Sequence, residues 1–207
     1  MNLSNRLWKD NFYLAEKSLQ TKFVQNLKTG KLPKEKFKLY VAQDAFFLEC
    51  FARAYGLAVS KAKDKNMIKI LSQLLIGVSE ELVLHDSYAQ KWGINLDKNS
   101  IEPVTKNYTD FLNEVSQKSN LIEIICAMAP CMCLYSWIGR SLANHKKNNP
   151  YKEWIETYSD KDFENLAKTL ENLIDISNKT NKLDNLNSLY KKAMELELDF
   201  FYAFSNF

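Results

Sequence analysis

Apolar residues recur every three to four positions along most of the chain, which is the spacing of an amphipathic helix. The first predicted helix begins at Ser4 or Asn5, runs without a break through Leu27 and stops at Gly30. The others are predicted near residues 33–58, 67–92, 103–115, 121–143, 151–158, 160–176 and 183–204. Alternation with a period of two is nowhere sustained, and no repeat or linker divides the chain. The pattern therefore predicts one all-α domain over residues 1–207, a bundle of about seven to eight helices.

Composition and charge argue against nucleic-acid binding and membrane association. With 46% hydrophobic and 26% charged residues, the chain resembles a globular protein with a substantial core. Its 28 basic and 25 acidic residues are dispersed and form no basic stripe, which argues against nucleic-acid binding. The apolar stretch 121–138 contains Glu123 and Ser136, so we expect a buried core helix and no membrane association. The charged N-terminal segment lacks the apolar core of a secretory signal, so the expected location is cytoplasmic, with reduced thiols.

Three of the four cysteines lie close together in the segment ICAMAPCMCLYSWIG, residues 125–139. Cys131 and Tyr135 are four residues apart and share one face of a helix, which makes a thiol and a phenol a candidate reactive pair. Cys133 lies about 200° from Cys131 around the helix, so the two cannot chelate one metal ion unless the helix breaks at Pro130. A buried cysteine acting only as a small apolar residue is the alternative.

Two acidic residues interrupt apolar helix faces. Asp44 shares its face with Phe47 and Phe51, where a carboxylate is costly to bury unless it is paired. Glu197 is three and four residues from Phe200 and Phe201, and a carboxyl group among rings can act as a proton donor near neutral pH. The alternatives are a boundary Asp44 paired with Arg53 or a lysine, and a solvated surface Glu197.

The remaining candidate site residues are three tyrosines and one pair of possible metal ligands. Tyr108, Tyr135 and Tyr158 lie among apolar residues, and a cavity lined by rings, hydroxyls and acids suits a flat heteroaromatic ligand. Glu81 and His85 have the spacing of a carboxylate-bridged di-iron site, but the other ligands that such a site needs cannot be assembled. The sequence therefore predicts no metal site.

Four separated segments, in this order, resemble the TenA family, also called thiaminase II or aminopyrimidine aminohydrolase. They are YVAQDAFFLECFARAYGLAVSKA from residue 40, NYTDFL from 107, APCMCLYSWIG from 129, and YKEWIETYSDKDF from 151 with the final ELDFF from 197. The joint match spans essentially the whole chain, and Cys131 indicates the cysteine-containing branch. The resemblance implies a heme-oxygenase-like helical bundle, a homotetramer, and activity without a metal or organic cofactor.

The resemblance also implies a reaction and a set of roles. The expected enzyme converts 4-amino-5-aminomethyl-2-methylpyrimidine to the 5-hydroxymethyl compound and ammonia in thiamin salvage, and cleaves thiamin to hydroxymethylpyrimidine and thiazole. By resemblance, Cys131 is the nucleophile and Glu197 the proton donor. The substrate-binding residues would be Asp44, Phe47, Tyr108, Tyr135, Tyr158 and Phe200.

One position departs from the family pattern. The third residue after Asp44 is often tyrosine in this family, and its hydroxyl is thought to assist the cysteine; here it is Phe47. Two other function classes stay open: a catalytically silent pyrimidine-binding protein, and a di-iron or cofactor-free oxidase on the same fold.

Overall fold

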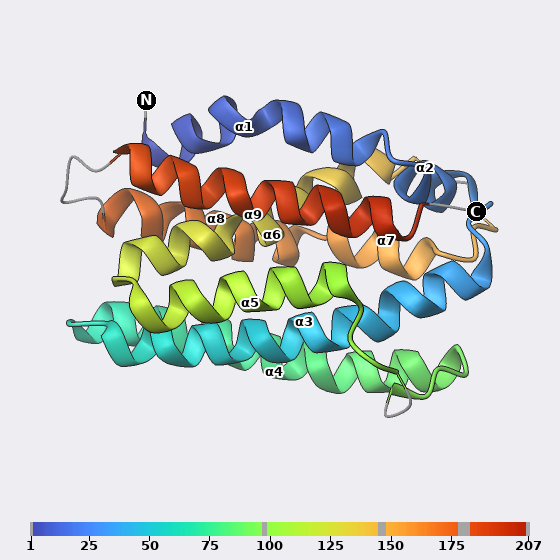
Figure 1. The fold of residues 1–207 in the computed structure, drawn as a ribbon, viewed down its shortest axis with the longest axis horizontal. Coiled ribbons are helices and arrows are strands. Elements are labelled where there is room, and N and C mark those ends of the chain that lie inside the picture. Colours follow the sequence, from blue (N-terminus) through green and yellow to red (C-terminus); the bar gives the residue numbers. More distant parts are fainter. Residues whose placement is uncertain (1, 97–98, 145–147, 178–182, 206–207) are drawn as a thin grey trace. The chain divides into compact units, whose positions relative to one another are not determined.

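A computed structural model describes residues 2–96, 99–144, 148–177 and 183–205. In these ranges the chain forms nine α-helices and no strand, so the all-α prediction is confirmed (Figure 1). The helices are α1 (Leu3–Leu19), α2 (Lys22–Thr29), α3 (Lys34–Lys61), α4 (Lys65–Lys91), α5 (Pro103–Lys118), α6 (Leu121–Leu142), α7 (Lys152–Ser159), α8 (Lys161–Ser177) and α9 (Leu183–Ala203).

The first predicted helix is two helices, which corrects the prediction of an unbroken helix up to Leu27. Thr21 leaves the helical conformation, and its side chain accepts a hydrogen bond from the backbone N–H of Val24. The same hydroxyl donates to the carbonyl of Ser18 at 2.8 Å. A single threonine thus ends α1 and caps α2. Gly30, at a φ of 71°, ends α2 as predicted.

Helix α6 is the most apolar segment and continues through Pro130 without a break. Among the described residues it alone is long and apolar enough to cross a membrane, judged by length and composition. Within its most apolar window, 78% of the residues are buried inside the protein, as expected of a core helix. Because the helix is unbroken, Cys131 and Cys133 keep the angular separation predicted for them.

The chain divides into two compact units, residues 1–32 with 125–207 and residues 33–124. The prediction of a single domain over 1–207 stays a prediction. In the first unit, α1 packs along α9 and α8, and α2 packs on α9 (Figure 1). The carboxylate of Asp175 in α8 accepts hydrogen bonds from the backbone N–H and the hydroxyl of Ser4, both at 2.8 Å. This contact satisfies donors at the start of α1, where the N-cap Asn2 makes no side-chain bond.

The second unit is built on α3, which packs against both α4 and α5 (Figure 1). The fully buried Gln43 fixes the chain entering α5: its side chain donates to the carbonyl of Ser100 and accepts from the N–H of Glu102. At the other end of α5, the ammonium group of Lys61 donates to the carbonyls of Ser116, Gln117 and Ser119. A cation at a helix C-terminus satisfies its last carbonyls and complements its dipole. The two ends of α5 are thus tied to α3.

Candidate functional site

The predicted site residues divide between the two units. Cys131 and Tyr135 on α6, Tyr158 on α7, and Glu197 and Phe200 on α9 belong to the first unit. The second unit holds the other three, Asp44 and Phe47 on α3 and Tyr108 on α5.

Cys131 differs from the other three thiols in its exposure. It is partly exposed, whereas Cys50, Cys126 and Cys133 are buried. Burial, chiefly, raises the pKa of Cys50 to about 11, and it raises the pKa of Cys133 far above the usual range. The Cys133 thiol lies 3.8 Å from Glu171, to which it donates. Because a nucleophile must be reachable and form a thiolate, Cys131 is the best candidate of the four.

Aromatic contacts join α6, α7 and α9 around Tyr135. Its ring centroid lies 4.8 Å from that of Tyr158 and 5.4 Å from that of Phe201. Gly139 allows the close approach of α6 to the end of α7, because a Cβ there would lie 2.3 Å from the carbonyl carbon of Tyr158. The sequence WIG in α6 thereby sets the place of Tyr158 beside Tyr135.

Glu197 is buried, with 2% of its surface exposed, so it is not a solvated surface residue. The two acids beside it are more open to solvent: Glu195 is 41% exposed at its side chain, and Asp199 is exposed. Phe200 is also buried, and its ring lies 5.0 Å from that of Phe204. A buried carboxyl group is suited to proton transfer.

Asp44 is buried as well, and its partner is a residue that the sequence reasoning considered only as a metal ligand. The Oδ2 atom of Asp44 lies 3.5 Å from Nε2 of His85 on α4. Arg53, one of the alternative partners considered for Asp44, instead binds Glu49 at 2.8 Å one turn away. Burial lowers the pKa of His85, but contact with Asp44 and the charges of Asp44, Glu81 and Asp86 outweigh it, so the pKa is raised overall.

Phe47 and Tyr108 form an aromatic contact between α3 and α5. Their ring centroids lie 4.8 Å apart, and Phe47 also stacks on Phe51 at 5.3 Å. Both Phe47 and Tyr108 are buried. The second unit therefore brings a carboxylate, an imidazole and a ring pair onto neighbouring helices.

Metal ligands do not cluster in the part of the chain that the structure describes. No group of three or more His, Cys, Asp or Glu side chains there could hold a metal ion. The thiol of Cys131 and the buried carboxyl groups and phenols of the two units are residue types suited to nucleophilic and acid–base chemistry.

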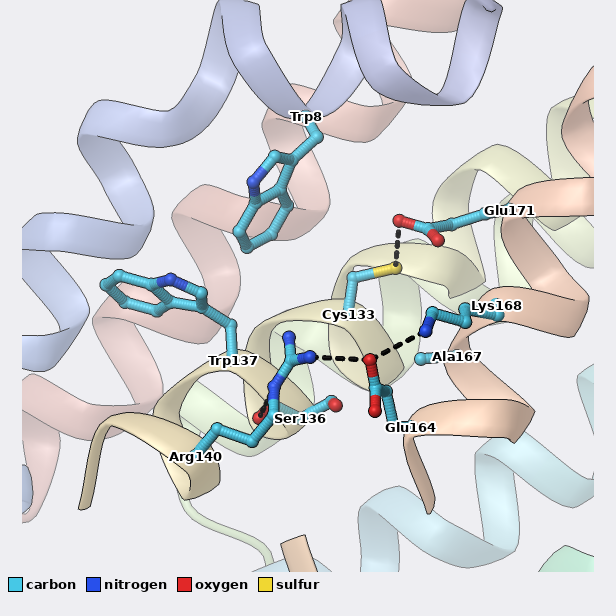
Figure 2. A pocket seen from close by; sticks show the side chains of 9 residues that line it. All are labelled: Trp8, Cys133, Ser136, Trp137, Arg140, Glu164, Ala167, Lys168 and Glu171. Carbon is cyan, nitrogen blue, oxygen red and sulfur yellow. Dashed lines mark hydrogen bonds and ion pairs between the residues drawn. The ribbon is translucent and has the colours of Figure 1, made fainter. Parts of the chain in front are cut away.

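A separate pocket of about 110 Å³ lies between α1, α6 and α8 (Figure 2). Its lining includes Cys133 but not Cys131, together with two indole rings and charged residues of α6 and α8: Trp8, Cys133, Ser136, Trp137, Arg140, Glu164, Ala167, Lys168 and Glu171. Hydrogen bonds from Lys161 and Lys168, with a further cation in Arg140, lower the pKa of Glu164 to about 2. These cations lie at 2.7 Å from the carboxylate, so the charged side of this pocket is internally neutralised. Of the lining residues, sequence reasoning discussed only Cys133 and Ser136, and it did not predict a pocket here.

The helices define an all-α protein in the part of the chain that the structure describes. A sequence profile of the TENA/THI-4/PQQC family matches residues 14–206, and the chain belongs to this family. A solved TenA homologue from P. horikoshii OT3 superposes with a TM-score of 0.92 at 28% identity, covering 99% of this chain and 98% of that one. A Shewanella denitrificans domain described as having a heme oxygenase-like fold superposes at 0.78 with 13% identity, which supports the predicted bundle.

Two curated relatives have named functions. The aminopyrimidine aminohydrolase of Halalkalibacterium halodurans is 34% identical over 160 residues, covering 74% of this chain and 71% of the relative. The mitochondrial bifunctional TH2 protein of Arabidopsis thaliana is 34% identical over 214 residues, covering 90% of this chain. The chain spans only 34% of the length of the TH2 protein.

Proposed function

We propose that the protein is an aminopyrimidine aminohydrolase of the cysteine-containing branch, acting in thiamin salvage. It hydrolyses 4-amino-5-aminomethyl-2-methylpyrimidine to the 5-hydroxymethyl compound and ammonia, and it cleaves thiamin to hydroxymethylpyrimidine and thiazole. Membership of the family and relatives that carry this activity support the proposal. The observation that carries it is the selective exposure of Cys131 among the four cysteines, at the family's nucleophile position.

The proposed steps assign one role to each reacting group. The Cys131 thiolate adds to a ring carbon while Glu197 protonates a ring nitrogen, which makes the ring electron-rich. The C–N bond to the exocyclic methylene then breaks, and the amine, which is already protonated near neutral pH, leaves as ammonia. Water adds to the methylene and releases one proton, which the ammonia can take up. Glu197 recovers its proton from the ring nitrogen, and the C–S bond breaks to restore the thiolate. Atoms balance as aminomethyl compound plus water giving hydroxymethyl compound plus ammonia.

The remaining residues would hold the pyrimidine. Asp44 accepts a hydrogen bond from the ring's amino group, and Tyr135 and Tyr158 bind its polar edge. Phe47, Tyr108 and Phe200 supply flat surfaces for the ring. Because Phe47 lacks the hydroxyl common at this position, Cys131 is activated by other groups, and turnover is slower than in family members with tyrosine there.

Product formation with purified protein tests the proposal. Chromatography should show hydroxymethylpyrimidine released from the aminomethyl compound with no metal added and with a chelator present. Cys131→Ser and Glu197→Gln should each lower kcat at least about a hundredfold, the usual scale for a lost nucleophile or general acid. Cys133→Ser is the matched control and should retain activity, because its thiol faces Glu171. Undiminished turnover in Cys131→Ser would contradict the nucleophile assignment.

A catalytically silent pyrimidine-binding protein is the second candidate, and Phe47 is the observation that favours it. That candidate predicts tight calorimetric binding of hydroxymethylpyrimidine with no turnover of any aminopyrimidine or of thiamin. Iron-dependent oxidation, the other alternative, predicts activity that a chelator abolishes. Product analysis with and without a chelator, together with calorimetric binding, therefore distinguishes the hydrolase, the binding protein and the iron-dependent oxidase.

We also propose a homotetramer located in the cytoplasm, on the strength of the family resemblance. Size-exclusion chromatography with light scattering should give four times the 24.1 kDa chain mass. A monomer peak at assay concentrations would contradict the assembly without affecting the proposed chemistry.

A further inference from the structure

Asp44 and His85 form an ionic contact between α3 and α4, inside one compact unit. Oδ2 of Asp44 and Nε2 of His85 are 3.5 Å apart, and both side chains are 10% exposed. An ionised carboxylate in the middle of an aromatic helix face is costly without a counter-ion. Among the described residues, His85 is the only cation recorded at ion-pair distance from this carboxylate. The imidazole is therefore what compensates the charge of Asp44.

The carboxylate keeps hydrogen-bonding capacity on its other oxygen. The contact with His85 is made through Oδ2, so Oδ1 is not the atom that meets the imidazole. A carboxylate can accept through both oxygens at once. One oxygen can thus hold the imidazole while the other receives an N–H from a ligand.

The histidine itself is not satisfied as a structural residue would be. Its Nδ1 atom is buried and has no hydrogen-bond partner among the described residues, and Nε2 has the 3.5 Å contact with Asp44. Leaving a buried group such as Nδ1 unpaired costs about 1–3 kcal/mol, and native proteins rarely accept this except at functional sites. The charged groups that raise the pKa of His85 are acidic: Asp44 from α3, and Glu81 and Asp86 from its own helix. This environment favours the imidazolium form.

We propose that His85 is a positioning residue that acts through Asp44, holding this carboxylate oriented so that it receives the amino group of the substrate. The inference rests on the proposed function, and it adds a residue that the family pattern quoted above does not contain. In its cationic form His85 fixes one oxygen of Asp44. Loss of the proton at high pH removes the counter-ion and loosens the carboxylate, so substrate binding weakens.

The pair can be tested without any turnover, because the chain has only two histidines, His85 and His145. Proton NMR of the imidazole signals gives each pKa, and His85→Gln assigns the signals. The pKa of His85 should fall in Asp44→Asn and should fall by a smaller amount in Glu81→Gln. An unchanged His85 pKa in Asp44→Asn would overturn the inference.

Steady-state kinetics measure the effect of His85 on catalysis separately from its pKa. His85→Gln should raise KM about tenfold with less than about a threefold change in kcat, as loss of one binding interaction predicts. The alkaline fall of kcat/KM should disappear in His85→Gln. In Glu81→Gln, which leaves the Asp44 contact in place, that fall should move to lower pH because a negative charge near His85 is gone. An alkaline limb that stays at the same pH in both variants would also overturn the inference.

A failure of the hydrolase proposal can be told apart from a failure of the proposed role of His85. If wild-type protein turns over no pyrimidine, the hydrolase proposal fails, while NMR and calorimetric binding of hydroxymethylpyrimidine still decide the role of His85. Equal affinity of wild type and His85→Gln at pH 6 would count against the positioning role in that case. Circular dichroism of each variant establishes that a loss of binding is not a loss of fold.

Discussion

At the scale of single residues, Cys131 is partly exposed whereas the other three cysteines are buried. Cys50 donates toward the carbonyl of Thr109 and the side chain of Asn113, and Cys133 donates toward Glu171. Both have raised pKa values because burial penalises their thiolates. A cysteine in such surroundings behaves as a small apolar residue, the alternative weighed for all four. Only Cys131 is partly open to a reagent or a substrate.

We predict that iodoacetamide alkylates Cys131 first in the native protein. The pKa of about 11 at Cys50 reduces its thiolate fraction roughly a hundredfold relative to an ordinary cysteine. Peptide mass spectrometry after brief labelling at pH 8 should find the modification at Cys131 and little at Cys50 or Cys133. Full labelling of all four in urea is the control, and equal native labelling would contradict the assignment.

Sequence reasoning found the residues that break a pattern but not their partners. Asp44 and Glu197 stood out as acids on apolar helix faces, and both are buried. His85 was missed as the partner of Asp44, because periodicity gives the face of a helix and not which residue of a neighbouring helix lies opposite. The rule that a buried acid needs a partner, applied to a chain with two histidines, was the available signal.

At the scale of helices, the predicted elements were correct where a proline or glycine marks a boundary. Pro103 begins α5, and Gly30 ends α2. The break before α2 was missed because apolar spacing continues through it and a threonine is a weak signal. Gly139 could not be recognised from the sequence as a packing position, because its neighbours resemble those of any helix interior. Only the close packing against Tyr158 in the structure explains why glycine stands there.

We predict opposite effects for two glycine-to-alanine changes within helices. At Gly139 an added Cβ meets the backbone of Tyr158 and Ser159 at 2.3–2.6 Å, so α7 must move. Gly139→Ala should lower the free energy of unfolding by about 1–3 kcal/mol, the scale of overpacking. At Gly77 in α4 nothing lies within 4 Å, and Gly77→Ala should add about 0.5–1 kcal/mol.

Urea denaturation of both variants measures the difference. If the hydrolase proposal is correct, Gly139→Ala should also raise KM, because Tyr158 is displaced. Equal stability of the two variants would show that the end of α7 adjusts freely to the extra methyl group.

At the scale of the whole molecule, the pKa of His85 links folding to pH. Its pKa in the folded protein is raised above the ordinary value of 6.5. A raised folded pKa stabilises the folded state fully below the unfolded value, and this contribution is lost as pH rises through the folded value. The protein therefore gains stability from this group on the acidic side of neutrality.

We predict that the difference in unfolding free energy between wild type and His85→Gln shrinks as pH rises from 5.5 to 9. Urea denaturation at half-unit steps gives the two curves. Only the slope of the difference matters, since any constant offset reflects packing. Parallel curves would show that His85 has the same pKa folded and unfolded.

The order in which the chain is made has a consequence for α1. Its apolar side packs on α8 and α9, the last helices of the sequence, and Ser4 meets Asp175 across most of the chain. Residues 33–124, by contrast, form a contiguous unit. During synthesis this middle unit can fold first. Leu7 and Leu14 of α1, which are buried in the folded protein, stay exposed to solvent until α8 and α9 have been made. The nascent chain therefore carries an exposed apolar helix until α8 and α9 have been synthesised, which makes α1 a segment that a chaperone would bind.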